Sequence, residues 1–227
     1  MVHNRYYTGG YRLSLDFAKL RTEMLDRQLR ERGIRDKRVL AAMSGIPREL
    51  FIPEQHWAKA YEDEPVPIGH GQTISQPFMT AFMAQALEMT GGESVLDVGS
   101  GSGYHAAVLG QLAKCVTSIE IVPELVEFAR GNLIRAGLIR NVSVVRGDGG
   151  DGFPEQAPFD AISVAAGAPE VPPGLLEQLN DPGRLVIPVG PMEDQELRLV
   201  TKRGGQIESR VVTLCRFVPL RGAHGWQ

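Results

Sequence analysis

The stretch that decides the fold is "SVLDVGSGSGYHAAVLGQL", residues 94–112. An apolar run ends at an acidic residue, the chain turns through glycines at every second position, and another apolar segment follows. This pattern is typical of a β-strand, a glycine turn and an α-helix. Glycine lets a backbone adopt positive φ and approach a ligand closely. The stretch therefore predicts a binding turn at the carboxyl end of a strand.

The rest of the C-terminal part alternates in the same way. Strand-like and helical segments follow one another, with strands expected at 94–98, 115–121, 142–146, 160–165 and 184–189 and helices at 103–113, 123–136 and 173–180. Such alternation predicts an α/β, Rossmann-like fold, a mostly parallel sheet with helices on both faces. Two strand-like runs around Gly204 and Gly205 predict antiparallel strands at the C-terminus.

The N-terminal third has a different character. Helical spacing predicts a helix over 14–32, a second one capped by Asp36, and a third beginning near Pro77. Prolines and glycines make the segment between the last two mostly irregular, so 53–76 is a candidate lid. We expect one compact unit, with 1–76 as a helical extension and covering loop and 77–227 as the ligand-binding core. No role is assigned to residues 1–13.

Composition excludes several classes of protein. The chain has 227 residues, 43% hydrophobic and 22% charged, and a formal net charge of -3. This balance predicts a globular protein that binds neither nucleic acid nor an anionic membrane. The first thirty residues contain no leader-like or membrane-spanning pattern, so we expect a cytoplasmic protein. Cys115 and Cys215 are expected in the core, with no metal site.

The spacing of the glycines bears on the ligand. A dinucleotide turn requires G-x-G-x-x-G, whereas Gly99, Gly101 and Gly103 give G-x-G-x-G. Asp97 precedes them, and a negative charge there would repel a pyrophosphate. It would suit a ligand with positive charge, such as an ammonium or a sulfonium. The turn therefore favours S-adenosyl-L-methionine over a nicotinamide dinucleotide.

Two further acids lie at the ends of the next predicted strands. Glu120 is about twenty residues past the turn, where a carboxylate accepts hydrogen bonds from both ribose hydroxyls. Its alternative role is that of an exposed residue at a strand end. Asp148, in "RGDG", is placed to accept from the exocyclic amine of an adenine, or else it only forms the turn. With Asp97 they make one constellation at three strand ends.

Several longer stretches then carry a family resemblance. "IGHGQTISQPFMTAFMAQAL" (68–87), "VLDVGSGSGY", "GDG", "APFDAISVAAGAPEVP", "GRLVIPVG" and "RFVPLRGAHGW" occur in this order. From about Leu25 to the C-terminus the chain resembles the protein-L-isoaspartate O-methyltransferases. Three places depart from the family's pattern. "NDPGR" (180–184) stands where a Lys-Pro-Gly-Gly-like turn is usual, Ala165 replaces a common threonine, and His105 stands where glutamine is common. We expect His105 on the helix surface or near the adenine.

The resemblance implies an enzyme and a reaction. A methyl group passes from S-adenosyl-L-methionine, leaving S-adenosyl-L-homocysteine, to the free carboxylate of an L-isoaspartyl residue in a damaged protein or peptide. The methyl ester then cyclises to a succinimide. A carboxylate is already ionised at pH 7, so no general base is needed, and the task is to position it. The simplest assembly is a monomer.

The resemblance also assigns residues to the site. Ser75 of "TIS" corresponds to the family's active-site serine and is the expected catalytic residue; its alternative role is to cap the helix that starts near Pro77. The expected cofactor-binding residues are Ile68, Gly69, His70, Gly71, Thr80, Asp97, Gly99, Ser100, Gly101, Gly103, Glu120, Asp148 and Gly149. The expected substrate-binding residues are Thr73, Ile74, Ser75, Ala166, Pro219 and Leu220, with Arg221 and Trp226 as weaker candidates.

Three other functions remain open on the residues alone. One is a methyltransferase for a small molecule or RNA, which the turn and the acids permit. Against it stand the "TIS" segment, the "FVPL" tail and the lack of a basic face with interleaved aromatics. A second is a module that binds S-adenosylmethionine without turnover. A third is a nicotinamide dehydrogenase, which the turn disfavours.

Overall fold

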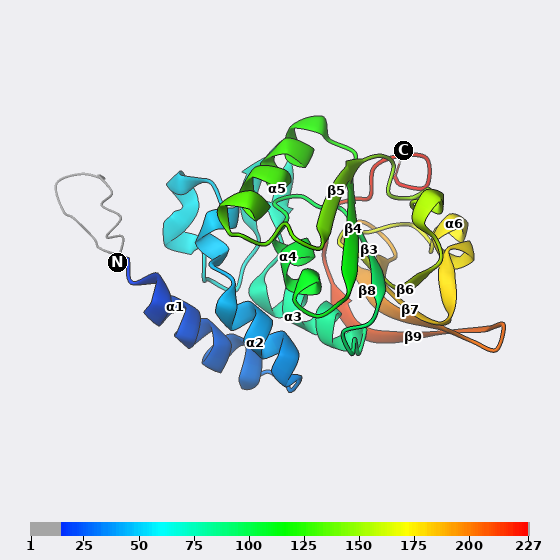
Figure 1. The fold of residues 1–227 in the computed structure, drawn as a ribbon, viewed down its shortest axis with the longest axis horizontal. Coiled ribbons are helices and arrows are strands. Elements are labelled where there is room, and N and C mark those ends of the chain that lie inside the picture. Colours follow the sequence, from blue (N-terminus) through cyan, green and yellow to red (C-terminus); the bar gives the residue numbers. More distant parts are fainter. Residues whose placement is uncertain (1–14, 227) are drawn as a thin grey trace.

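A seven-stranded sheet forms the centre of the computed structural model, which describes residues 15–226 (Figure 1). The strand order is β5-β4-β3-β6-β7-β8-β9. Pairing is parallel from β5 through β7, and β7, β8 and β9 pair antiparallel. The strands are β3 (Ser94–Val98), β4 (Cys115–Glu120), β5 (Val142–Arg146), β6 (Phe159–Val164), β7 (Leu179–Val189), β8 (Gln195–Arg203) and β9 (Gln206–Cys215). The predicted parallel sheet and terminal hairpin are confirmed.

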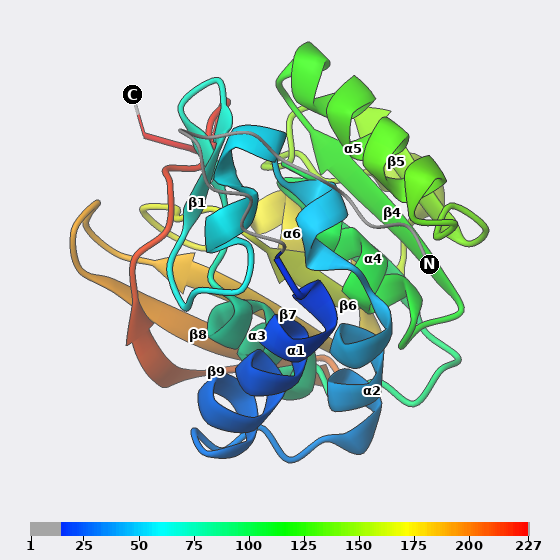
Figure 2. The same ribbon diagram turned by 90° about the vertical axis from the view of Figure 1, so that its left-hand side faces the viewer.

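Helices cover the two faces of the sheet unequally. α4 (Tyr104–Gly110) and α5 (Pro123–Arg135) lie on one face, while α6 (Pro173–Glu177), a helix of five residues, lies on the other (Figure 1). The prediction of helices on both faces is therefore confirmed. Two N-terminal helices, α2 (Lys37–Gly45) and α3 (Pro77–Ala86), pack beside α4 on the same side of the sheet (Figure 2). The π-helical segment Met24–Arg30, which continues α1 (Phe17–Glu23), packs against α2 and α3.

Two hydrophobic clusters hold these layers together. The larger contains Met24, Phe51 and Met83 from the N-terminal part together with Val108 from α4 and Leu133 from α5. The smaller fills the opposite face of the sheet around residues such as Leu96, Phe159, Ile162, Leu175 and Leu185. The N-terminal helices thus share a core with the sheet that carries the glycine turn.

The segment expected to be mostly irregular contains short regular elements. Two 3₁₀-helices, Arg48–Phe51 and Glu54–Lys59, are followed by an antiparallel pair, β1 (Val66–Gly69) and β2 (Gln72–Ile74). A third 3₁₀-helix, Pro154–Gln156, lies before β6. The β1–β2 turn is tight because Gly69, His70 and Gly71 all have positive φ. The expectation of an irregular segment was wrong here, since strands of three or four residues are too short to show alternation.

The cysteines differ from expectation. Cys115 is exposed and Cys215 is half-buried, so neither is a core residue, and both are free thiols. Cys115 is the first residue of β4, and it is exposed at that end of the strand. Across residues 15–226, no helix combines the length and the apolar character needed to cross a membrane.

Candidate active site

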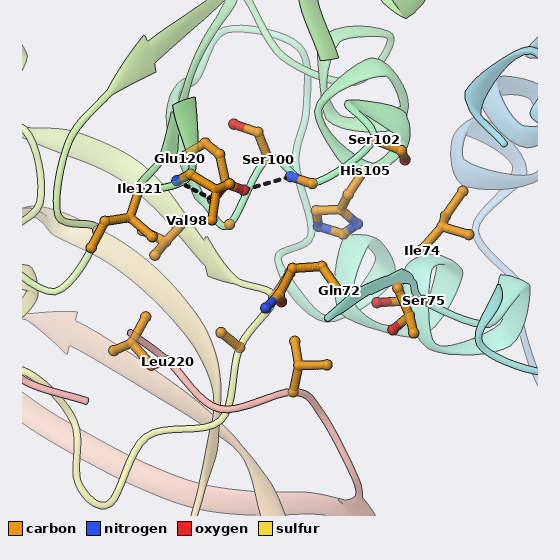
Figure 3. A pocket seen from close by; sticks show the side chains of 18 of the residues that line it. Gln72, Ile74, Ser75, Val98, Ser100, Ser102, His105, Glu120, Ile121 and Leu220 are labelled. Atoms are coloured by element: carbon orange, nitrogen blue, oxygen red, sulfur yellow. Dashed lines mark hydrogen bonds between the residues drawn. The ribbon is translucent and has the colours of Figure 1, made fainter. Parts of the chain in front are cut away.

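The glycine turn between β3 and α4 forms one wall of a pocket (Figure 3). Gly99, Gly101 and Gly103 all have positive φ, at 91°, 52° and 84°. The carboxylate of Glu120 holds the turn, since Oε2 accepts from the Gly101 N–H at 2.9 Å and Oε1 accepts from the Val122 N–H at 3.0 Å. The turn also packs closely against β1, since a Cβ at Gly101 would lie 3.3 Å from Ile68 Cδ1.

The pocket brings together residues from both halves of the chain. Glu120 lies on one side and Ser75 on the other (Figure 3). The pocket is lined by most of the expected residues, namely Thr73, Ile74, Ser75, Thr80, Gly99, Ser100, Gly101, Glu120, Gly149, Ala166, Pro219, Leu220 and Arg221. It is also lined by residues that the sequence did not indicate, including Gln72, Ser102, Tyr104, Ile119, Ile121 and Val218.

Ser75 follows β2 and precedes α3, but it does not cap the helix. The N-cap residue is Gln76, which makes no side-chain capping bond, and the Phe78 N–H donates instead to Asp63 at 3.3 Å. Within residues 15–226, the Ser75 hydroxyl has no hydrogen-bond partner, and the residue is half-buried in the pocket wall. The hydroxyl is therefore free to bind a ligand.

Ser75 also lies at a junction between two hollows. A second groove shares Thr73, Ser75, Ala165, Val218 and Pro219 with the pocket. Its remaining lining is largely apolar and comes from Pro65, Gln76, Met79, Met192, Leu214, Cys215, Arg216 and Phe217. A ligand in the first hollow and another in the second would thus meet at Ser75.

The segment after β9 forms the opposite rim of this junction. Gly167 holds it at two points, because the Gly167 N–H donates to the Val218 carbonyl and the Leu220 N–H donates to the Gly167 carbonyl, each at 2.8 Å. Within the described chain, Val218 N–H and Pro219 carbonyl have no hydrogen-bond partner. The backbone groups open to a ligand are thus the N–H of Val218 and the carbonyl of Pro219, while the N–H of Leu220 already donates to Gly167.

Asp97 does not face the pocket. Its side chain is fully buried beneath the turn, where Oδ2 accepts from the Ser118 hydroxyl at 2.6 Å. Oδ1 is buried and has no hydrogen-bond partner within the described chain. Burial, with a smaller contribution from the negative charge of Glu120, raises the pKa of Asp97 to about 7. Asp97 therefore does not line the pocket, because the strand pleat directs its side chain to a buried face of the sheet.

Asp97 belongs to a polar layer that crosses three strands. It is in register with Ser118 of β4 and Ser163 of β6, and the hydroxyl of Ser118 lies 2.6 Å from that of Ser100. His105 joins the layer through its Nε2, 2.9 Å from the Ser163 hydroxyl. Burial lowers the pKa of His105 to about 4, so the ring is neutral at pH 7. His105 therefore lines the pocket from within, rather than lying on the helix surface.

Asp148 is engaged by the C-terminal tail. Its carboxylate accepts from the Gly150 N–H at 2.9 Å and from the Ala223 N–H at 2.7 Å. It does not line the pocket, and neither do Ile68, Gly69, His70, Gly71, Gly103 or Trp226. The β1–β2 turn is joined to the tail, because Arg221 Nη2 donates to the His70 carbonyl at 3.2 Å. The turn and the tail thus meet at the rim of the pocket.

Comparison with known proteins agrees with this geometry. The family model "Protein-L-isoaspartate(D-aspartate) O-methyltransferase (PCMT)" matches residues 20–225. The chain belongs to the protein-L-isoaspartate O-methyltransferase family. The resemblance noted in the sequence is therefore confirmed over nearly the whole chain.

Individual relatives support the same assignment. A protein-L-isoaspartate O-methyltransferase of Methanoculleus marisnigri is 51% identical over 207 residues, covering 91% of this chain and 94% of that protein. Protein-L-isoaspartate O-methyltransferase 2 of Marinobacter nauticus is 53% identical over 213 residues, covering 93% and 97%. A solved family structure from Plasmodium falciparum, in complex with S-adenosyl-L-homocysteine, has 31% identity and a TM-score of 0.77, covering 88% of this chain and 98% of that chain.

Proposed function

We propose that this protein is a repair enzyme that transfers the methyl group of S-adenosyl-L-methionine to the free carboxylate of L-isoaspartyl residues in damaged proteins and peptides. The observation that carries the proposal is the position of Ser75, where the pocket of the glycine turn opens into the apolar groove. The relatives from Methanoculleus marisnigri and Marinobacter nauticus are named as protein-L-isoaspartate O-methyltransferases, which supports this proposal. The resulting ester would cyclise to a succinimide.

The pocket fits an adenosine-containing cofactor. The turn glycines carry no side chains and have positive φ, which leaves their backbone open to a ligand. Each carboxylate oxygen of Glu120 accepts one hydrogen bond from a backbone N–H. Further lone pairs therefore remain to accept from ribose hydroxyls. We assign S-adenosyl-L-methionine to Thr80, Gly99, Ser100, Gly101, Glu120 and Gly149. Ile68 and Gly103 would act from behind, by shaping the turn.

For methyl transfer, the main task of the protein is to position the substrate carboxylate. When bound, S-adenosyl-L-methionine supplies a methyl group activated by a positively charged sulfur. The Ser75 hydroxyl donates a hydrogen bond to one oxygen of the substrate carboxylate and so orients the other. A carboxylate is ionised at neutral pH, so the residues need not remove a proton. Neutral His105 is accordingly given no proton-transfer role.

The second groove supports a polypeptide as substrate. Its walls are largely apolar side chains, including Met79, Met192 and Phe217, which suit the flanking residues of an extended peptide. The unpartnered backbone groups of Val218 and Pro219 at its rim suit a peptide backbone. We assign substrate binding to Thr73, Ile74, Ser75, Ala166, Val218 and Pro219, and to Leu220 through its side chain only. These contacts favour a protein substrate over RNA.

We further propose a monomer that acts in the cytoplasm without nucleic-acid partners. The two free thiols suit a reducing compartment, and the net charge of -3 does not attract phosphate backbones. Of the expected extension 1–76, the described residues 15–76 would serve as a cover for the core expected over 77–227, and residues 1–14 lie outside the described part of the chain.

A repair assay tests the proposal. An isoaspartyl peptide is incubated with the protein and S-adenosyl-L-methionine, and the normal aspartyl peptide is measured by chromatography. We expect the aspartyl form to accumulate through a succinimide, and only when the cofactor is present. An isoaspartyl peptide that remains unchanged and unmethylated, while the protein binds S-adenosyl-L-homocysteine, would refute the proposal.

A further inference from the structure

Arg48 is a fully buried cation directly behind the proposed active-site serine. It begins the 3₁₀-helix Arg48–Phe51 and has no exposed surface. Its Nε donates to the Ala60 carbonyl and its Nη2 donates to the Ser75 carbonyl, both at 2.7 Å. The guanidinium carbon lies 4.7 Å from the centre of the Tyr104 ring, which lines the pocket. Arg48 therefore links the N-terminal part of the chain to both walls of the site.

This cation lacks a counter-ion. Among residues 15–226, no carboxylate forms an ion pair with Arg48, and its Nη1 is buried with no hydrogen-bond partner. Of the nearby acids, Glu49 is bound by Arg21 and Tyr61, and Asp63 is bound by Arg32. Burial is the largest influence on Arg48 and lowers its pKa. A buried charge without a counter-ion lowers the stability of the fold. Its position behind a pocket therefore points to a negatively charged ligand as the missing counter-ion.

The peptide bond that Arg48 holds has a second, open side. The bond between Ser75 and Gln76 is trans, so the Gln76 N–H points away from the carbonyl that accepts from Arg48. Within the described chain this N–H has no hydrogen-bond partner, and Gln76 lines the second groove. Arg48 thus fixes a unit that offers two free donors, the Ser75 hydroxyl and the Gln76 N–H.

We propose that Arg48 is a positioning residue for the substrate carboxylate. The negative charge of the carboxylate balances the positive charge of the buried guanidinium, and the Ser75–Gln76 peptide bond lies between the two groups. The proposal rests on the proposed function and extends it. Arg48 orients the two donors and attracts the anion without touching it. The charge stabilises the bound carboxylate in the ground state and in the reaction alike, so its loss should raise KM more than it lowers kcat.

A pair of ligands separates charge recognition from folding. One peptide carries isoaspartate, and the other carries isoasparagine, whose neutral amide has the same shape. Calorimetry measures the Kd of both for protein loaded with S-adenosyl-L-homocysteine, in the unaltered protein, Arg48→Met and Arg48→Lys. We expect Arg48→Met to reduce the preference for the carboxylate at least about tenfold, which corresponds to about 1.4 kcal/mol. Arg48→Lys keeps the positive charge and should retain most of the preference.

Arg38→Met is the matched control. Arg38 also donates to two backbone carbonyls, those of Met89 and Leu112, but it lines neither the pocket nor the groove. It should leave the preference for the carboxylate unchanged. Equal weakening of both peptides by Arg48→Met would overturn the proposal and leave Arg48 a structural role. Weaker binding of S-adenosyl-L-homocysteine with an unchanged peptide preference would also overturn it, by assigning the charge to the cofactor.

Two further results keep the outcomes distinct. If the unaltered protein does not prefer the carboxylate peptide, the proposed function itself fails. If Arg48→Met does not fold, nuclear magnetic resonance of ¹⁵N-arginine in the unaltered protein decides, with the Arg48 side-chain signal assigned from its absence in Arg48→Lys. The carboxylate peptide should shift this signal at least about threefold more than the amide peptide. Equal shifts would overturn the proposal.

Discussion

The side-chain amide of Gln195 binds both backbone groups of Phe217. Its Oε1 accepts from the Phe217 N–H at 2.8 Å, and its Nε2 donates to the Phe217 carbonyl at 3.2 Å. Gln195 begins β8 and is 1% exposed. Gly167 makes room for it, since a Cβ there would lie 2.3 Å from Nε2. The rim of the groove is therefore set by a buried side chain that lines neither the pocket nor the groove.

Replacing Gln195 should loosen this rim. Gln195→Ala leaves the N–H and carbonyl of Phe217 without partners, at a cost of about 1–3 kcal/mol in the free energy of unfolding. We expect KM for an isoaspartyl peptide to rise about fivefold or more, with a smaller change in kcat. Steady-state kinetics measure both. Gln206→Ala, at an exposed position of β9, is the control, and an unchanged KM in Gln195→Ala would refute the role.

Ser75→Ala should impair methyl transfer and leave the cofactor in place. A hydrogen bond to a charged group contributes about 1.5–3 kcal/mol, which corresponds to a decrease of about 10- to 100-fold in kcat/KM. Because the hydroxyl bonds to nothing else in the described chain, the unfolding temperature should hardly change. Ser209→Ala, on the exposed part of β9, provides the comparison. Wild-type kcat/KM in Ser75→Ala would remove Ser75 from the mechanism.

Glu120→Gln should weaken cofactor binding. Its amide keeps one acceptor oxygen but loses the charge, and its NH₂ group would face one of the two N–H donors that the carboxylate now binds. We expect the Kd for S-adenosyl-L-homocysteine to rise about 10- to 100-fold, as measured by calorimetry. Glu124→Gln changes the same charge at an exposed position of α5 and should have little effect. Comparable affinities in the two variants would contradict the role of Glu120.

Asp97 should give the stability of the unliganded protein a distinctive dependence on pH. Its pKa is about 7 in the fold and 3.8 for an unperturbed aspartate, so between these pH values the folded state binds a proton that the unfolded state does not. Its contribution is therefore complete below pH 3.8 and is lost as pH rises towards 7. Asp97→Asn has no carboxyl group to titrate, so it does not lose this stability. The unfolding free energy of the variant minus that of wild type should therefore increase with pH, by up to about 1.4 kcal/mol per pH unit.

Denaturant unfolding across this pH range measures the difference directly. Its sign is informative because buried His105, whose pKa is lowered to about 4, acts the other way, stabilising the fold as pH rises to 6.5. The comparison of Asp97→Asn with wild type cancels the contribution of His105. A difference that stays flat from pH 4 to pH 7 would show that Asp97 is ionised throughout.

What the sequence predicted well are features with a local pattern. The run from Ser94 into α4 specifies strand, turn and helix by its own periodicity, and Glu120 was identified because parallel strand ends meet at one edge. The burial of Asp97 was not predicted, because its position at a strand end does not reveal its side-chain direction. The pleat sets it in register with Ser118 and Ser163 and turns it inward.

Other features depend on distant parts of the chain meeting in space. The contact between Arg48 and Ser75 spans 27 residues, and that between Asp148 and Ala223 spans 75. The free N–H of Val218 becomes a candidate only once Gly167 and Gln195 fix its neighbours. No periodicity records such pairings, so these residues could not be found from the sequence alone.

The most direct measurement of the central claim is the transfer of labelled methyl groups to two peptides of identical composition. One peptide carries L-isoaspartate and the other carries L-aspartate at the same position, and each is incubated with the protein and methyl-labelled S-adenosyl-L-methionine. We predict base-labile label on the isoaspartyl peptide alone, as expected for a methyl ester. Label on both peptides, or on neither while S-adenosyl-L-homocysteine still binds, would contradict the account.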